Sequence, residues 1–97
     1  MLKGKAKRYL RSLAVLETPI LQIGKGSITP NIIKQLDDAL AARELVKIRV
    51  LNTHEISAKE LAPMLSEATN SVLVQVIGHN IVLYRRSPEK PKIELPN

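Results

Sequence analysis

Cysteine is absent from the sequence. Its absence excludes disulfide bonds, thiolate zinc sites and thiol catalysis, and it is typical of a protein that works in a reducing compartment. No segment approaches the roughly 20 consecutive apolar residues of a membrane span, and the N-terminus lacks the apolar region of a signal peptide. We therefore expect a cytoplasmic protein with no membrane contact.

Aromatic residues are scarce, because Tyr9 and Tyr84 are the only two and the sequence has neither Phe nor Trp. Modules that read single strands by base stacking usually present several exposed aromatic side chains. A stacking platform of that kind is excluded. Any nucleic acid bound by this chain would be held through its backbone and its shape.

Positive charge is what the sequence has in excess. Fifteen Lys and Arg residues oppose nine Asp and Glu residues, which gives a net charge of +6 and an isoelectric point near 9.9. The chain has 97 residues, of which 44% are apolar, so we expect one folded domain over residues 1–97. A balance this basic indicates a polyanionic partner, although basic domains without such a partner also exist.

Hydrophobic periodicity and turn residues predict seven elements. They are helix 3–16, strand 20–23, a helix from Pro30 to Arg43-Glu44, strand 44–51, a helix from Ser57 to about Thr69, strand 72–77 and strand 81–84. Two helical crossovers predict that the first three strands are parallel, and the hairpin at 78–80 adds an antiparallel strand. The expected fold is α/β, in the order α-β-α-β-α-β-β, with a single four-stranded mixed sheet packed with helices.

Local signals mark the element boundaries. Thr29 is a typical N-cap with Pro30 at the first helical position, and Ser57 and Glu60 form a capping box. Pro63 removes one backbone hydrogen bond, so the third helix is expected to kink or to begin later. Residues 86–97 contain three prolines and are expected to form an extended tail, in which 92–95 are a candidate edge strand.

Two amphipathic elements present basic side chains. The predicted inward stripe of the first helix holds Ala6, Tyr9, Leu10, Leu13 and Leu16, while its opposite face holds Lys7, Arg8 and Arg11. Strand 44–51 alternates, with Val46, Ile48 and Val50 on one face and Lys47 and Arg49 on the other. We expect a half-exposed strand with a basic outer face, and a further basic segment at Arg85 and Arg86. Each of these could also be an ordinary solvated surface.

The turn Gly24-Lys25-Gly26-Ser27 leads directly into the second helix. Glycines let a backbone approach a ligand closely, and the first helical N–H groups carry the positive end of the helix dipole. With Lys25 at its tip, the turn is a candidate site for one or two phosphates, although such a turn also occurs with no ligand. The spacing of a nucleotide-triphosphate loop is missing.

Catalysis finds little support in the sequence. His54 and His79 are the only imidazoles, and neither has a second metal ligand at suitable spacing or a nucleophile with an acid–base partner. Asp37 and Asp38 are explained as solvated residues on the flank of a helix. We expect no enzyme activity, no metal and no cofactor.

Several segments resemble the CRM domain (chloroplast RNA splicing and ribosome maturation) in its bacterial single-domain YhbY-like form. These segments are Lys7-Arg8-Tyr9-Leu10, 22–29, 43–48, 74–78, 81–85 and 92–96. The resemblance covers nearly the whole chain and implies a fold similar to the C-terminal domain of bacterial translation initiation factor three. It also implies RNA binding and an association with precursors of the large ribosomal subunit. The family loop commonly reads Gly-x-x-Gly, and Ser27 stands here at the second glycine.

The sequence and the resemblance together predict a monomeric RNA-binding protein that assists assembly of the large ribosomal subunit. The candidate RNA contacts are Lys7, Arg8, Arg11, Gly24, Lys25, Gly26, Ser27, Lys47, Arg49, Arg85 and Arg86. Two alternatives stay open: a basic module that docks on a protein or an anionic membrane surface, and an enzyme that acts on RNA.

Overall fold

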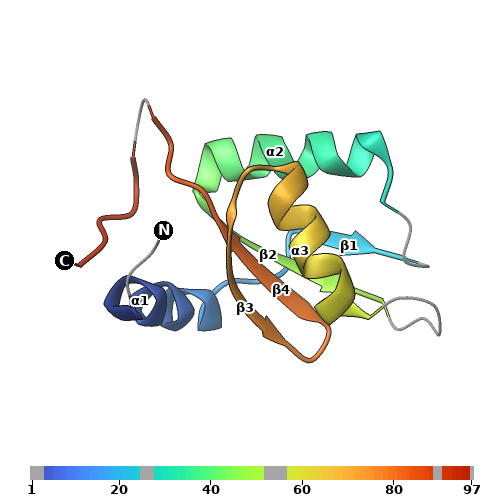
Figure 1. The fold of residues 1–97 in the computed structure, drawn as a ribbon. Coiled ribbons are helices and arrows are strands. Elements are labelled where there is room, and N and C mark those ends of the chain that lie inside the picture. Colours follow the sequence, from blue (N-terminus) through green and yellow to red (C-terminus); the bar gives the residue numbers. More distant parts are fainter. Residues whose placement is uncertain (1–3, 25–27, 52–56, 89–90, 97) are drawn as a thin grey trace.

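The computed structural model describes residues 4–24, 28–51, 57–88 and 91–96 (Figure 1). Its elements are α1 (Gly4–Val15), β1 (Leu21–Ile23), α2 (Pro30–Arg43), β2 (Leu45–Val50), α3 (Ala58–Ala68), β3 (Val72–Ile77) and β4 (Asn80–Tyr84). The predicted element order and the α/β class are confirmed.

The sheet has four strands in the order β1-β2-β4-β3. β1 runs parallel to β2, and β4 runs antiparallel to both β2 and β3. The first three strands therefore share one direction, as predicted, but the last strand lies between β2 and β3. Gly78 opens the two-residue turn of the β3–β4 hairpin with a φ of 56°, which a glycine adopts without the strain that a side chain would bring.

Helix starts follow the sequence signals. The Thr29 hydroxyl accepts a hydrogen bond from the backbone N–H of Ile32 at 3.2 Å, and the Ser57 hydroxyl accepts one from Glu60 at 3.3 Å. The later start considered for the third helix is wrong, because α3 begins at Ala58 and continues through Pro63 to Ala68.

Two hydrophobic cores lie on opposite faces of the sheet. The first joins the sheet to α2 and α3, and its largest members are Ile23, Leu36, Leu40, Ile48, Leu61, Leu65, Ile81 and Leu83. The second joins the sheet to α1 and consists of Leu10, Ala14, Leu45, Val74, Val82 and Tyr84, with Leu13, Ile93 and Leu95 packed against it. The sheet therefore has helices on both faces, with α2 and α3 on one and α1 across one end of the other (Figure 1).

This second core corrects two expectations. Lys47 does not lie on an open strand face but is half-buried, because α1 covers that part of the sheet and the Ala14 carbonyl accepts a hydrogen bond from Lys47 Nζ at 3.4 Å. The inward stripe of α1 ends earlier than predicted: Tyr9 is 39% exposed and Leu16, beyond the helix, is 84% exposed, while Ala14 is buried instead.

The C-terminal segment does not form the candidate edge strand, since residues 91–96 have no regular secondary structure. It is nevertheless held against the domain, because Ile93 and Leu95 pack on the second core. Among the described helices, none combines the length and the apolar character needed to cross a bilayer.

Candidate nucleic-acid interface

The outer face of α1 is basic. Arg8 and Arg11 are exposed, Lys7 is half-buried, and no acidic residue occurs anywhere in the helix. Arg8 and Arg11 point away from the sheet because the opposite stripe, with Leu10 at its centre, is packed on the second core. The predicted exposed placement is therefore observed for Arg8 and Arg11, whereas Lys7 is only partly exposed.

β2 contributes one exposed cation, Arg49, to the same side of the molecule. Arg49 is exposed and shares the face of Leu45 and Lys47, on which α1 packs. In the sheet register Arg49 lies between Gln22 of β1 and Asn80 of β4. Lys47 lies one step nearer to α1, where its amine is already hydrogen-bonded.

Of the predicted phosphate-binding turn, only Gly24 lies within the described residues, and Lys25, Gly26 and Ser27 lie outside them. A Cβ atom added to Gly24 would meet Leu51 Cδ1 at 3.5 Å, which is an ordinary contact distance. Sterics in the described structure therefore do not require glycine at position 24. Gly24 follows β1 at the same end of the sheet as Arg49.

Arg85 is engaged within the protein. Its guanidinium forms an ion pair with Asp37 of α2 and donates hydrogen bonds to the Thr69 carbonyl at 2.9 Å and the Asp37 carbonyl at 3.0 Å. Its side chain is only 24% exposed. The interpretation of Asp37 as a merely solvated residue is thus wrong, because this carboxylate connects α2 to the end of β4.

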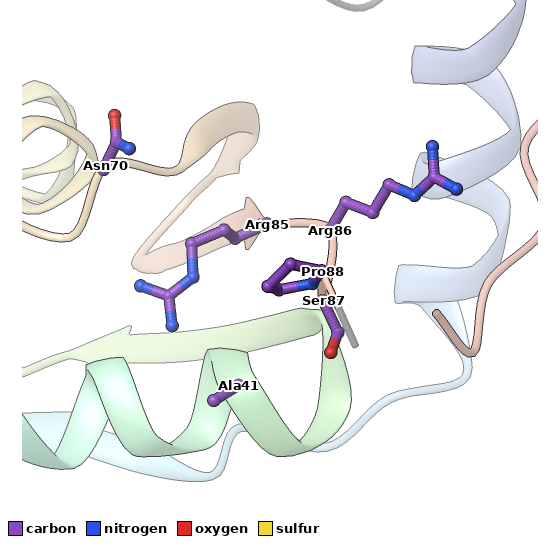
Figure 2. A pocket seen from close by; sticks show the side chains of 6 residues that line it. All are labelled: Ala41, Asn70, Arg85, Arg86, Ser87 and Pro88. Atoms are coloured by element: carbon purple, nitrogen blue, oxygen red, sulfur yellow. The ribbon is translucent and has the colours of Figure 1, made fainter. Parts of the chain in front are cut away.

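Arg86 differs from its neighbour because it is exposed. Both arginines border an open hollow at the end of β4, and Figure 2 shows their side chains extending in different directions, with Arg86 on the side where α1 lies. The residues that line this hollow are Ala41, Asn70, Arg85, Arg86, Ser87 and Pro88. Two adjacent cations therefore have different surroundings.

Glu44 is the buried charged residue that sequence reasoning missed. It caps the C-terminus of α2 with a φ of 67° and is fully buried. Its carboxylate accepts backbone hydrogen bonds from Ser87 at 2.7 Å, from Ile93 at 2.7 Å and from Lys92, and its carbonyl accepts one from Arg85 at 2.9 Å. One side chain thus holds the C-terminal segment onto the domain. A glutamate between Arg43 and Leu45 at a helix end gives no sequence signal for this role.

These contacts also set the ionisation of Glu44. Burial alone would raise the pKa of this carboxyl, but three backbone N–H donors and the nearby Arg86 charge favour the ionised form and hold the pKa below its ordinary value. The carboxylate is therefore charged at neutral pH.

Charge is distributed unevenly between the two sides of the sheet. On the side of α1 the exposed cations include Lys5, Arg8, Arg11, Arg49 and Arg86. The helices of the other side carry the acids Asp37, Asp38, Glu60 and Glu67 among their own basic residues. The described part of the chain holds no group of three or more side chains suited to a metal ion. The side of α1 is consequently the surface best suited to a polyanion.

Known proteins share this sequence and fold. The CRS1 / YhbY (CRM) domain family matches residues 2–85. A Bacillus subtilis protein named "Probable RNA-binding protein YqeI" is 51% identical over 96 residues, which cover 99% of this chain and 100% of that protein. A Haemophilus influenzae protein named "RNA-binding protein" is 33% identical over 95 residues, covering 98% of this chain and 95% of its own length.

A solved structure agrees with the family match and with the two relatives. The solution structure of a Staphylococcus aureus protein, described as a candidate RNA-binding protein, superposes with a TM-score of 0.82 at 61% identity and covers 99% of this chain and 100% of that one. The sequence match, the topology and the structural match lead to one conclusion: the chain belongs to the CRS1 / YhbY (CRM) domain family.

Proposed function

We propose that this chain is a non-catalytic, monomeric cytoplasmic protein that binds structured ribosomal RNA during assembly of the large ribosomal subunit. The observation that carries the RNA-binding part is the acid-free outer face of α1, with Arg8 and Arg11 exposed on it. The relatives named as RNA-binding proteins support the same partner. The ribosomal target rests on the family resemblance of the sequence.

In this proposal Arg8, Arg11 and Arg86 contact phosphates from the side of α1, and Arg49 contacts the RNA from its exposed position on β2. The turn 24–27 supplies further contacts through Lys25 and its amides. Lys7 and Lys47 add positive potential at close range from their half-buried positions. Arg85 acts indirectly, because its guanidinium holds α2 and α3 to the end of β4.

The test is equilibrium binding to large-subunit ribosomal RNA fragments and to length-matched duplex DNA over a salt series. We expect a preference for folded RNA that persists at physiological salt. Replacing Arg8 and Arg11 with Ala should reduce the slope of log affinity against log salt by about one unit for each phosphate that the variant no longer neutralises. The matched control replaces Lys34 of α2 and Lys59 of α3, which are exposed on the opposite side.

Equal effects of the two double variants on RNA binding would contradict the proposal that RNA binds on the side of α1.

Lys25→Ala tests the turn in the same assay, since an unchanged salt slope and affinity would exclude Lys25 as a contact. The ribosomal part is tested by sedimentation, in which the protein should travel with large-subunit precursors and lose that association when Arg8 and Arg11 are replaced.

A docking module for an anionic membrane or a protein is the second candidate, and one observation favours it. Val15, the last residue of the basic helix α1, and Leu16, which follows it, are 75% and 84% exposed. Apolar residues beside a basic helical face are typical of segments that bind anionic bilayers. Binding to anionic vesicles as tight as binding to RNA, and its loss when Val15 and Leu16 are replaced with Ser, would favour this candidate.

A further inference from the structure

A row of four side chains crosses the whole sheet where β1 and β2 end. Gln22 pairs with Arg49, Arg49 pairs with Asn80, and Asn80 pairs with Ile77. Residues paired across neighbouring strands point to the same face of a sheet, so these four side chains form one line, which we call the end row. Three strand spacings make it about 14 Å long.

The end row lies on the face that α1 covers only in part. Leu45, Lys47 and Arg49 occupy every second position of β2 and therefore share one face of the sheet. On this face α1 packs over Leu45 and contacts Lys47 through the Ala14 carbonyl. In Figure 1, α1 lies toward the start of β1, and the far end of that strand extends beyond the helix.

Beyond the helix no described element covers this face of the sheet. Gln22 and Arg49 are exposed, Ile77 is 53% exposed, and Asn80 is half-buried. An exposed β-branched side chain and three polar side chains thus share a surface that no described element covers.

The chemistry of the end row suits a nucleic-acid base better than a phosphate. Gln22 and Asn80 each present an amide donor beside an amide acceptor, and Arg49 between them presents a planar fork of donors. A phosphate has no hydrogen to donate to an amide oxygen, whereas base edges carry both donors and acceptors. Asn80 Oδ1 is a buried side-chain acceptor without a hydrogen-bond partner in the part of the chain that the structure describes. The Asn80 amide must therefore turn outward before this oxygen can accept from a base amino group.

The backbone around the end row is fixed before any ligand arrives. Val50 N–H donates to the His79 carbonyl at 2.7 Å, which joins the end of β2 to the hairpin turn. Leu51 N–H donates to the Ile23 carbonyl at 2.8 Å, which joins it to the end of β1. Side chains mounted on strands held in this way lose less freedom on binding than side chains on a loop.

We propose that the end row binds the base of an unpaired purine nucleotide in the RNA. Arg49 and the two amides hydrogen-bond the base edge, as bidentate Arg contacts to guanine and Asn or Gln contacts to adenine do, and Ile77 packs against its apolar surface. The inference rests on the proposed function that this chain binds RNA. It adds base discrimination to a surface that otherwise recognises only charge and shape.

The experiment measures affinity for RNA hairpins with one common stem and loops of adenosine, guanosine, cytidine or uridine, at constant salt. The variants are Arg49→Lys, which keeps the charge but loses the fork, and Gln22→Ala. Both positions are exposed, so the fold should persist and unfolding midpoints check this. We expect wild type to favour a purine loop over uridine about tenfold or more, and both variants to bring the ratio within about twofold. The salt slope of Arg49→Lys should equal that of wild type.

Arg8→Ala separates this inference from the proposed function. It should weaken all four hairpins equally, lower the salt slope and leave the purine preference intact. Equal affinity of wild type for all loops, with the Arg8→Ala effect present, would overturn the end row while RNA binding stands. Failure to bind any hairpin would overturn both the end row and the proposed RNA binding.

A direct readout is NMR of the Gln22 and Asn80 side-chain amides, whose signals should shift with a purine trinucleotide and not with triuridine. Shifts confined to α1 with both ligands would also overturn the end row.

Discussion

At the scale of single residues, Glu44 is the side chain on which the C-terminal segment depends. Glu44→Gln keeps the shape but places an NH2 group against backbone N–H donors, so at least one bond becomes a repulsive contact. We expect a loss of about 2 kcal/mol in the free energy of unfolding, or a fall of about 8–16 °C in Tm. Urea and thermal unfolding followed by circular dichroism measure it. Glu17→Gln, at an exposed position, is the control and should change little.

The same carboxylate predicts a pH dependence of stability. Because the pKa of Glu44 is lower in the folded state, its ionised form stabilises the fold at pH values above the ordinary glutamate pKa of about 4.3. That contribution is lost as the pH falls below this value and through the folded-state pKa. Urea midpoints between pH 6 and pH 3 should therefore fall more steeply for wild type than for Glu44→Gln. Parallel curves would assign the acid sensitivity to other carboxylates.

At the scale of elements, the adjacent arginines after β4 have separable roles. Arg85→Ala removes the guanidinium that joins α2 to the C-terminus of α3, and it should lower the free energy of unfolding by about 1 kcal/mol. Arg86→Ala should leave stability unchanged within about 0.5 kcal/mol and reduce the salt slope of RNA binding. Chemical denaturation and the salt series, applied to both variants, check the contrast. Equal destabilisation by the two changes would show that Arg86 also acts within the fold.

Elements whose cause is local could be predicted from the sequence, and those set by distant partners could not. Thr29 and Ser57 mark helix starts because each hydroxyl bonds a backbone N–H only three residues away. The half-burial of Lys47 was missed because alternation along a strand cannot tell solvent from a helix that covers the face. Glu44 and Arg85 were missed since their partners lie 16 to 49 residues away in the chain.

The candidate site divides in the same way. The basic face of α1 follows directly from helical periodicity, so Arg8 and Arg11 were placed correctly. The end row depends on which strands are neighbours. The position of β4 between β2 and β3 brings Asn80 beside Arg49, and no pattern within either strand predicts that pairing.

At the scale of the whole molecule, two separate cores predict two levels of stability. Among the described residues, twelve buried side chains form the core beneath α2 and α3, whereas six form the core beneath α1. Native-state hydrogen exchange should therefore show α1 amides opening at a lower free energy than the amides of β2 and β4. Leu10→Ala should lower the opening energy of α1 more than that of the sheet. A single opening energy for all elements would indicate that both cores unfold as one unit.

The position of β4 has a consequence for how the protein forms during its synthesis. Two of the three strand pairings, β2–β4 and β3–β4, require residues 80–84, and the Glu44 carboxylate finds its backbone donors only at residues 87–93. When the nascent chain has emerged from the ribosome only as far as β3, the one strand pairing available to it is β1 with β2. Until the residues after β4 leave the ribosome, the chain therefore exposes strand edges and a charge without its partners. We expect the sheet to be completed only after residues 80–93 have emerged.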